Sequence, residues 1–363
     1  MQHGRIAISA CLQKQLSHSS AERGREAARE GDPALNKKRV LITGGNGFVG
    51  TALCQEMRET WDVKAGVRRV DAGRVLPAGV EAVQLDVTRP EGWEMAFQDA
   101  DAVVHLAART HVVHEREPDS AALYETTNVE GTRRVLSACR RFGVPQLVYL
   151  SSIKAVGEGA NGPYAEDATC QPEDAYGFSK REAEKILENL PNSEGVCVRI
   201  LRPPLVYGPG VKGNFLRLLW AACQQVPLPI ACIRNARSMI YVGNLVHVIH
   251  ELLETPTTPS RTYHVADPGQ PLSTPALVRH LSSLMGRRSL LLPCPVPVLK
   301  SALSLVSRRD DARRLCNSLV VDASRIEREL GWRPPFDVPE ALGETVAWYM
   351  RERGTKHYGP NAS

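Results

Sequence analysis

The feature that most constrains the fold is a glycine-rich segment directly behind a short apolar run. Residues 40–42 are Val-Leu-Ile, and residues 43–50 read Thr-Gly-Gly-Asn-Gly-Phe-Val-Gly. This order is typical of a buried strand, a tight turn and the start of a helix. Gly44 allows the turn, Gly47 lets the backbone approach a pyrophosphate, and Gly50 permits close contact of helix and strand. The segment therefore predicts a dinucleotide site at a helix N-terminus, with a purely structural turn as the alternative.

Short apolar runs alternate with helical patterns through the first two hundred residues. The runs lie near 39–43, 62–68, 80–86, 101–106, 146–151 and 195–201, and the helical patterns near 48–58, 91–99, 121–142 and 174–190. The runs do not alternate apolar with polar residues, which suits strands buried on both faces of a parallel sheet. Repeated strand–helix–strand units predict an α/β fold with a Rossmann-type, doubly wound parallel sheet.

After Arg202 the pattern changes to clustered prolines and glycines, then helices near 213–225, 244–254, 274–285, 297–307 and 340–352. We interpret this half as a smaller C-terminal substrate-binding lobe over the carboxyl ends of the strands. The expected organisation is a disordered extension over 1–36, a nucleotide-binding domain over 37–203, a region over 204–350 that is mainly substrate-binding and can return strands to the sheet, and a tail over 351–363.

Composition excludes several other classes of protein. The formal charge is only +5 over 363 residues, and no basic stripe is interleaved with aromatic residues, so nucleic acid is a poor ligand. Nine cysteines lack metal-ligand spacing, which predicts reduced thiols, no metal site and a cytoplasmic location. The apolar stretch 290–306 contains Pro293, Pro295 and Pro297, so no transmembrane segment is expected. Arginines flanking that stretch leave a weak peripheral membrane contact as an alternative.

The second strand bears on cofactor choice. A carboxylate at its end would bond the ribose 2′-hydroxyl of NAD, but this chain has Arg68 there, and an arginine can pair with a 2′-phosphate. The residues favour NADP(H), with NAD(H) as the alternative and a solvated surface arginine as the structural reading. Asp86, at the end of the third strand, is expected at the adenine edge or as a helix cap.

A hydroxyl, a phenol and an ammonium follow in a fixed order. Ser152 ends the apolar run 147–150, and Tyr176 and Lys180 lie four residues apart on a predicted helix, so they share one face. A phenol titrates near 10, and we expect the neighbouring ammonium, together with the positive nicotinamide ring, to lower the pKa of Tyr176. The three residues predict proton transfer coupled to hydride transfer by a nicotinamide cofactor.

At these residues the chain resembles the extended short-chain dehydrogenase/reductases, and more narrowly their nucleotide-sugar epimerase/dehydratase group. The resemblance covers about 38–350. The matching stretches are 43–50, 104–108, 128–132, 151–152, 176–180, 201–210, 237–244 and 330–334.

The resemblance implies a role for each matching residue. Ser152, Tyr176 and Lys180 would be catalytic. The cofactor would contact Gly44, Gly47, Phe48, Val49, Gly50, Arg68, Asp86, Val87, Leu106, Ala107, Ala108, Asn128, Tyr176, Lys180 and Pro203. The substrate would contact Arg109, Ser152, Asn214, Arg237 and Arg313, the last chosen from the competing Arg308, Arg309, Arg313 and Arg314. For Asn128 a buried structural hydrogen bond, and for Arg237 a surface ion pair, are the alternatives.

The amino-acid sequence is also similar to those of bacterial reductases that act in surface-polysaccharide synthesis, such as lipopolysaccharide O-antigen pathways. The resemblance implies a UDP-linked sugar as substrate and reduction of a UDP-4-keto-6-deoxy-N-acetylglucosamine. The alternatives are a UDP-glucose or UDP-N-acetylglucosamine 4-epimerase and an NADP-sensing binding protein. Ser152 is followed by Ile153 and Lys154 rather than by an acidic pair, so a dehydratase is not expected. A homodimer through helices near 121–142 and 174–190 is expected from the same resemblance.

Overall fold

A seven-stranded parallel sheet organises the chain, in a computed structural model that describes residues 37–70, 76–110, 120–159, 162–190, 195–255, 259–305 and 309–353. The strand order is β3-β2-β1-β4-β5-β6-β9, and every pairing is parallel. The strands are β1 (Arg39–Thr43), β2 (Asp62–Val67), β3 (Glu81–Gln84), β4 (Ala102–His105), β5 (Gln146–Leu150), β6 (Cys197–Arg202) and β9 (Arg261–His264). The Rossmann-type fold expected from the sequence is confirmed.

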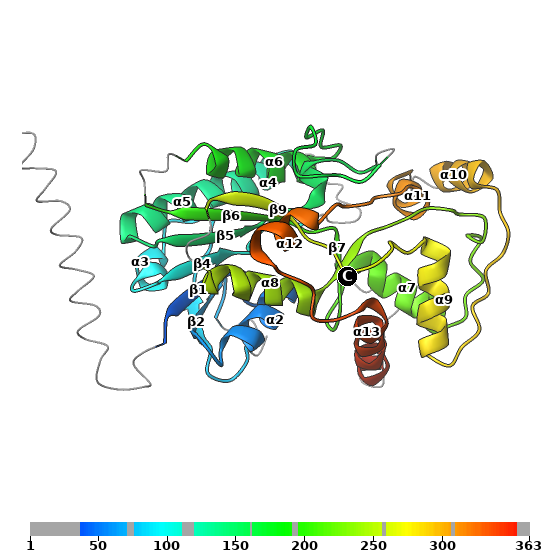
Figure 1. Ribbon diagram of the computed structural model, residues 1–363, viewed down its shortest axis with the longest axis horizontal. Helices are drawn as coiled ribbons and strands as arrows, with labels where there is room; N and C mark the ends of the chain where they lie inside the picture. Colours follow the sequence, from blue (N-terminus) through cyan, green and yellow to red (C-terminus); the bar gives the residue numbers. More distant parts are fainter. Residues whose placement is uncertain are drawn as a thin grey trace, which may run out of the picture.

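Helices cover both faces of this sheet (Figure 1). One face buries Val40 and Ile42 of β1 against α2 (Phe48–Met57) and α8 (Val242–Glu254). The other face buries Leu41 against α3 (Trp93–Phe97), α5 (Gly131–Phe142) and α6 (Ala175–Glu188). Successive side chains of a strand point to opposite faces, so the unbroken apolar run feeds two cores.

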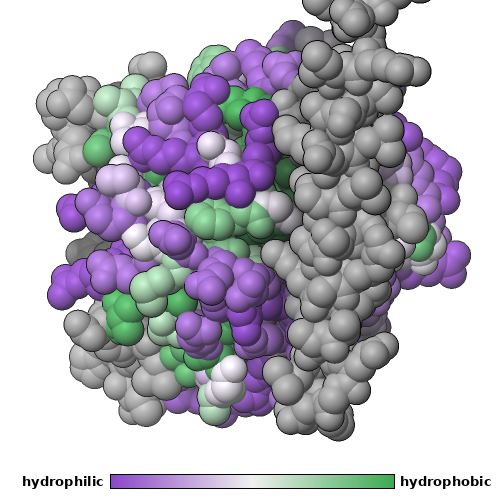
Figure 2. All heavy atoms as spheres, turned by 90° about the vertical axis from the view of Figure 1, so that its left-hand side faces the viewer, coloured by the Kyte–Doolittle hydropathy of each residue, from purple (hydrophilic) through white to green (hydrophobic). Residues whose placement is uncertain are grey.

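The remaining helices lie toward one end of the molecule, beyond the carboxyl ends of the strands, except the last but one, which lies beside β9 (Figure 1). They are α7 (Gly213–Cys223), α9 (Thr274–Leu284), α10 (Val296–Leu305), α11 (Arg309–Cys316), α12 (Ser324–Leu330) and α13 (Val338–Arg353). A second parallel pair, β7 (Leu205–Tyr207) and β8 (Met239–Tyr241), joins this end to the sheet. The opposite end, seen in Figure 2, presents mainly hydrophilic side chains where the surface is coloured.

Two local expectations needed correction. The helix expected over 121–142 is three consecutive segments, α4 (Ser120–Tyr124), the π-helix η2 (Glu125–Glu130) and α5. Helices α11 and α12 were not predicted, because both are short and mostly polar. Segments beyond residue 203 return to the sheet, as β9 pairs with β6 and α8 packs beside α2. The expected extension over 1–36 and most of the tail lie outside the described residues.

Candidate active site

The glycine turn lies where the strand order reverses, between β1 and β4. A Cβ on Gly44 would come within 2.9 Å of the Ala107 nitrogen, and one on Gly50 within 2.3 Å of the Gly44 oxygen. Gly44 also has φ +71°, a conformation that favours glycine. These contacts show why the turn needs residues without side chains.

The turn leaves the N-terminus of α2 open to an anion. Its N-cap, Gly47, supplies no side-chain hydrogen bond, and the first turn, which includes Phe48 and Val49, contains no acidic residue. Free backbone N–H groups and the helix dipole at such an end bind phosphate groups. The geometry therefore fits the pyrophosphate of a dinucleotide.

Arg68 and Asp86 lie on neighbouring strand ends. Arg68 directly follows β2 and is exposed. Partial burial alone would raise the pKa of Asp86, but hydrogen bonds from Thr88 and the charges of Arg68 and Arg89 hold it below its ordinary value. The Asp86 carboxylate accepts bonds from the Thr88 nitrogen at 2.9 Å and hydroxyl at 2.7 Å, so it closes the turn after β3. Val87 beside it is buried.

Ser152 and Tyr176 meet at the carboxyl end of β5. Ser152 caps the short 3-10 helix η3 (Ile153–Ala155), and its oxygen accepts a bond from the Lys154 nitrogen at 3.3 Å. The Ser152 hydroxyl lies near enough to the Tyr176 phenol to lower the pKa of the phenol. A Cβ on Gly177 would lie 2.5 Å from the Lys154 oxygen, so glycine allows α6 to begin directly against η3. The hydroxyl and the phenol, 24 positions apart in sequence, share one site.

Lys180 is buried between two aromatic rings. Its ammonium lies 4.6 Å from the centre of the Tyr149 ring and 6.0 Å from that of Tyr176, and it donates a 2.7 Å hydrogen bond to the Leu150 oxygen. Burial lowers its pKa to about 7, against a smaller opposing effect of Glu184. Lys180 is therefore a group that exchanges its proton near neutrality.

The chain's own groups do not lower the phenol pKa, whereas the expected lowering also invoked the positive nicotinamide ring. Burial raises the pKa of Tyr176 well above its ordinary value, and Asp174 and Tyr124 add to the rise. The Ser152 hydroxyl acts in the opposite direction but more weakly. Desolvation dominates because the phenolate is the charged form. Tyr176 consequently holds its proton at neutral pH.

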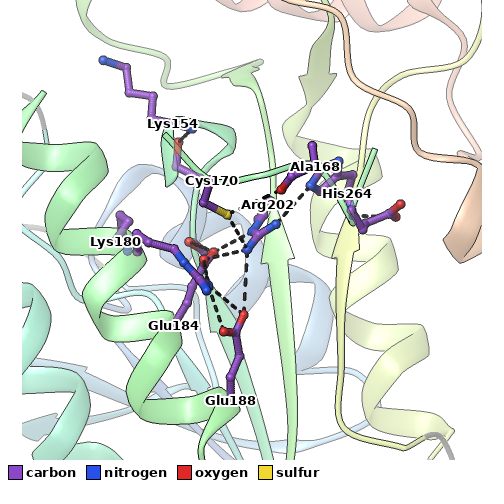
Figure 3. A network of polar contacts seen from close by, with 12 residues as sticks. Lys154, Ala168, Cys170, Lys180, Glu184, Glu188, Arg202 and His264 are labelled. Carbon is purple, nitrogen blue, oxygen red and sulfur yellow. Dashed lines mark hydrogen bonds and ion pairs between the residues drawn. The ribbon is translucent and has the colours of Figure 1, made fainter. Parts of the chain in front are cut away.

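A buried ion pair fixes the rear of α6. Glu184 is fully buried, and Arg202 at the end of β6 grips its two carboxylate oxygens with two 2.8 Å bonds. Ser151 donates a third bond to Glu184 at 2.6 Å. Figure 3 shows Arg202 reaching toward Glu184 and Glu188 on one side and toward Cys170 and His264 on the other. Because Glu184 lies one turn after Lys180, this network anchors the helix that carries the lysine.

Asn128 lies in the π-helix, and its amide is fully engaged within the protein. It accepts a bond from the Arg109 nitrogen at 2.8 Å and donates to the Arg109 oxygen at 3.0 Å and to the Ser179 hydroxyl at 2.8 Å. Ser179 in turn donates to the Tyr176 oxygen at 2.8 Å. The structural alternative for Asn128 is thus present, and it ties the loop after β4 to α6. π-helical turns occur often at functional sites.

The remaining predicted cofactor residues lie at the same end of the sheet. Leu106, Ala107 and Ala108 follow β4, and the Ala107 nitrogen donates to the Thr43 hydroxyl at 3.1 Å. Pro203 is buried, and its oxygen accepts a bond from Ile153 at 2.9 Å. These backbone contacts place the predicted residues along the ends of β1, β4, β5 and β6.

The predicted substrate residues are more dispersed. Asn214 is half-buried in the first turn of α7, and Arg109 lies after β4 with its guanidinium 5.9 Å from the Tyr124 ring centre. Arg237 donates to the Asn317 oxygen at 3.0 Å. Burial lowers the pKa of Arg237, the charge of Arg314 lowers it further, and Glu158 opposes both.

A charged cavity near the start of α6 is lined by Glu158, Glu173, Asp174, Arg313 and Arg314. Arg313 is exposed and bound to Glu173 at 2.9 Å, whereas Arg314 acts on Arg237. Arg314 therefore has the stronger structural link to Arg237 than the predicted Arg313. The side chains of Arg308 and Arg309 lie outside the described residues.

Sequence reasoning missed a set of charges beside the predicted catalytic trio. Lys154 lies between the carboxylates of Glu158 and Asp174. No acid follows Ser152 directly in the chain, yet the fold brings two near its turn. An acidic residue two positions before the tyrosine, at the expected helix N-cap, was the available signal.

The described residues contain no group of His, Cys, Asp or Glu suited to a metal ion. Within the same part of the chain, no helix is long and apolar enough to span a membrane.

Fold and glycine turn together define a dinucleotide-binding α/β protein. The chain belongs to the NAD dependent epimerase/dehydratase family, whose pattern matches residues 40–266. It is 34% identical over 322 residues to a UDP-glucose 4-epimerase of Vibrio cholerae, covering 86% of this chain and 96% of that protein. It is 27% identical to an Escherichia coli O157:H7 N-acetyl-α-D-glucosaminyl-diphospho-ditrans,octacis-undecaprenol 4-epimerase, covering 85% and 94%. The expected family is confirmed.

Solved structures share the fold at lower identity. MoeE5 in complex with UDP-glucose and NAD matches with a TM-score of 0.69 and 24% identity over 87% of this chain and 99% of that one. The UDP-glucuronic acid 4-epimerase of Bacillus cereus in complex with NAD matches with a TM-score of 0.70 and 20% identity, covering 86% and 99%.

Proposed function

We propose that the protein catalyses oxidation and reduction at C4 of a UDP-linked hexose, and that its main reaction is reduction of a UDP-4-keto-6-deoxy-N-acetylhexosamine. The observation that carries the proposal is the convergence of Ser152, Tyr176 and Lys180 beside the glycine turn. General acid–base catalysis needs such groups within hydrogen-bond reach of one reacting oxygen. Relatives named as nucleotide-sugar 4-epimerases support the choice of C4 and of a UDP-linked sugar.

A nicotinamide bound beside the glycine turn would supply or accept the hydride. Tyr176 would hold the proton destined for the C4 oxygen, since its pKa lies above neutrality before the reaction. Ser152, which acts on that phenol, would donate or accept a second hydrogen bond at the same oxygen. Lys180 would replenish the proton, because a group with a pKa of about 7 exchanges readily with solvent at neutral pH.

The substrate diphosphate would lie on the charged side of the site. Burying two negative charges without basic partners is costly, and Arg237 and Arg314 supply positive charge there. We take Arg314 in preference to Arg313 as the second phosphate residue, because Arg313 is held by Glu173. Asn214 and Arg109 are proposed as further substrate contacts.

A 4-epimerase is the second candidate, favoured by the Vibrio cholerae relative. Epimerisation keeps the reduced cofactor in place and returns its hydride to the other face of the keto-sugar. Incubation with UDP-hexoses and UDP-4-keto-sugars, each with NADH or NADPH, separates the candidates. Net loss of reduced-cofactor absorbance supports the reductase, interconversion without loss supports the epimerase, and cofactor binding without turnover of any sugar rejects both in favour of a sensing protein.

NADP(H) is the proposed cofactor because of Arg68, although the solved neighbours named above contain NAD. If Arg68 grips a 2′-phosphate, Arg68→Asp weakens NADPH binding roughly 10- to 100-fold more than NADH binding, the worth of one charge-assisted bond. Titration of each cofactor by calorimetry measures this. Arg69→Asp, a change at the exposed neighbouring arginine, is the matched control. Equal affinities for both cofactors in parent and variant would contradict the assignment.

Tyr176→Phe tests the mechanism itself. It removes the proton donor and keeps the ring, so kcat falls by about 10²–10⁴-fold. Cofactor affinity and thermal unfolding stay at parent values. Tyr263→Phe is the control, since it removes a phenol hydroxyl outside the proposed site. Tyr263 lies on the edge strand β9 and donates a hydrogen bond to Glu329 of α12. Activity of Tyr176→Phe within a few-fold of the parent would reject the proposed mechanism.

A further inference from the structure

Lys154 lies in the same turn as Ser152 and bridges two carboxylates. Its ammonium pairs with Asp174 at 2.5 Å and with Glu158 at still shorter range. The three side chains are 19–26% exposed, so water screens these pairs only in part. Burial raises the pKa of Glu158, and although burial acts likewise on Asp174, Lys154 and the capping bond hold the pKa of Asp174 below its ordinary value.

Asp174 belongs to the helix that carries the phenol. Its Oδ1 caps α6 by accepting a 2.7 Å bond from the Gly177 nitrogen, while its Oδ2 accepts from Lys154. Asp174 is two residues before Tyr176, and Lys154 is two residues after Ser152. The Asp174–Lys154 pair therefore joins the start of α6 to the turn that holds the serine.

Charge at this joint reaches the phenol. The groups facing Tyr176 are Ser152 from η3, Asp174 and Lys180 from α6, Tyr124 from α4 and Tyr149 from β5. Asp174 is the anion of this set that raises the pKa of Tyr176.

The charged groups around Lys154 are a second set. Glu158 and Asp174 pair with Lys154 directly. Glu158 and Asp174 line a cavity together with Glu173, Arg313 and Arg314, and Glu158 also acts on Arg237.

We propose that Lys154 is a positioning residue, which holds Ser152 against Tyr176 through Asp174 and balances the negative charge of Asp174 beside the phenol. This role rests on the proposed function of Tyr176. Lys154 lies outside the proposed catalytic trio and acts through two of its members, Ser152 and Tyr176.

The test measures kcat, KM and the pH–rate profile of four variants with the UDP-sugar that the parent turns over. Lys154→Met lowers kcat about 10- to 100-fold, because a small misplacement of reacting groups has effects of this size. KM changes little, since Lys154 supplies no diphosphate contact. The limb of the profile that depends on Tyr176 moves to higher pH, because uncompensated Asp174 disfavours the phenolate.

Two further variants separate position from charge. Lys154→Arg retains most of the activity, because a guanidinium also reaches both carboxylates. Lys154→Met/Asp174→Asn keeps the N-cap and removes the uncompensated charge, so the profile returns toward the parent's while kcat stays low. Lys185→Met is the matched control. Lys185 lies on α6, the helix that Asp174 caps, in an exposed pair with Glu182, and its loss leaves kcat, KM and the pH–rate profile unchanged.

Parent-like kcat and profile in Lys154→Met would overturn the inference, and so would equal damage from Lys154→Arg and Lys154→Met. A loss carried by KM alone with an unshifted profile would also overturn it. Tyr176→Phe in the same assay distinguishes the two levels: if it retains activity, the proposed function fails, and if it alone loses activity, only the role of Lys154 fails.

Discussion

Helix α6 meets one cluster of charges at each end, and the two clusters differ in burial. At the rear, Glu184 and Arg202 have side chains 0% and 3% exposed, with carboxylate and guanidinium paired through two bonds. At the front, Lys154, Glu158 and Asp174 lie at the wall of a cavity that also contains Glu173 and the arginines of α11. Tyr176 and Lys180 occupy the turns between them.

The difference assigns each cluster a different task. A charge deep in the protein cannot lose its partner without leaving an unsolvated ion, so the rear cluster anchors the helix. A partly exposed pair contributes little to stability, but it can adjust charge where a reaction occurs. We therefore expect rear substitutions to change stability and front substitutions to change turnover.

Arg202→Leu gives the largest expected effect. It leaves the buried Glu184 carboxylate without its main partner, so the free energy of unfolding falls by about 3–5 kcal/mol. Urea unfolding followed by circular dichroism measures the loss. Lys185→Met, which breaks an exposed pair on the same helix, loses about 1 kcal/mol or less. Equal losses in the two variants would remove the distinction between the clusters.

Lys180→Met gives a smaller effect that depends on pH. Burial lowers the pKa of Lys180 from 10.5 to about 7, so between these values the unfolded chain binds a proton that the folded chain lacks. Stability of the parent therefore rises with pH in this window, by up to about 1.4 kcal/mol per pH unit from this group. The variant loses that slope. Urea unfolding from pH 7 to 9 provides the measurement, and parallel slopes in parent and variant would show that Lys180 is solvated.

Much of the fold and of the cofactor side could be predicted because its signals are local. Buried parallel strands are continuous apolar runs, and the turn after β1 needs glycine at Gly44 and Gly50 for contacts within a few residues or to the adjacent strand. Tyr176 and Lys180 share a helix face through a four-residue spacing. The predicted strands consequently agree with the structure to within a few residues.

The substrate side could not be predicted as well because its residues come from distant segments. Glu158, Asp174 and Arg314 meet through three separate loops and helices. Burial also governs two proton affinities: it raises the pKa of Tyr176 and lowers that of Lys180. No spacing rule reports how much water a side chain loses on folding.

The same comparison predicts different effects on KM for the arginines around the front cluster. If the open side binds the diphosphate, Arg237→Ala raises KM for a UDP-linked substrate roughly tenfold, equivalent to about 1.5 kcal/mol for one charge-assisted bond, with less effect on kcat. Arg314→Ala raises KM as well, because Arg314 is the positive charge that acts on Arg237. Arg313→Ala has the weaker effect, since Arg313 is 60% exposed and already paired with Glu173. Steady-state kinetics with UDP as competitor supply the readout: UDP inhibits the parent and Arg313→Ala alike and the other two variants weakly. A larger KM change in Arg313→Ala than in Arg314→Ala would restore Arg313 as the phosphate residue, and equal inhibition of all four proteins by UDP would move the diphosphate away from this cluster.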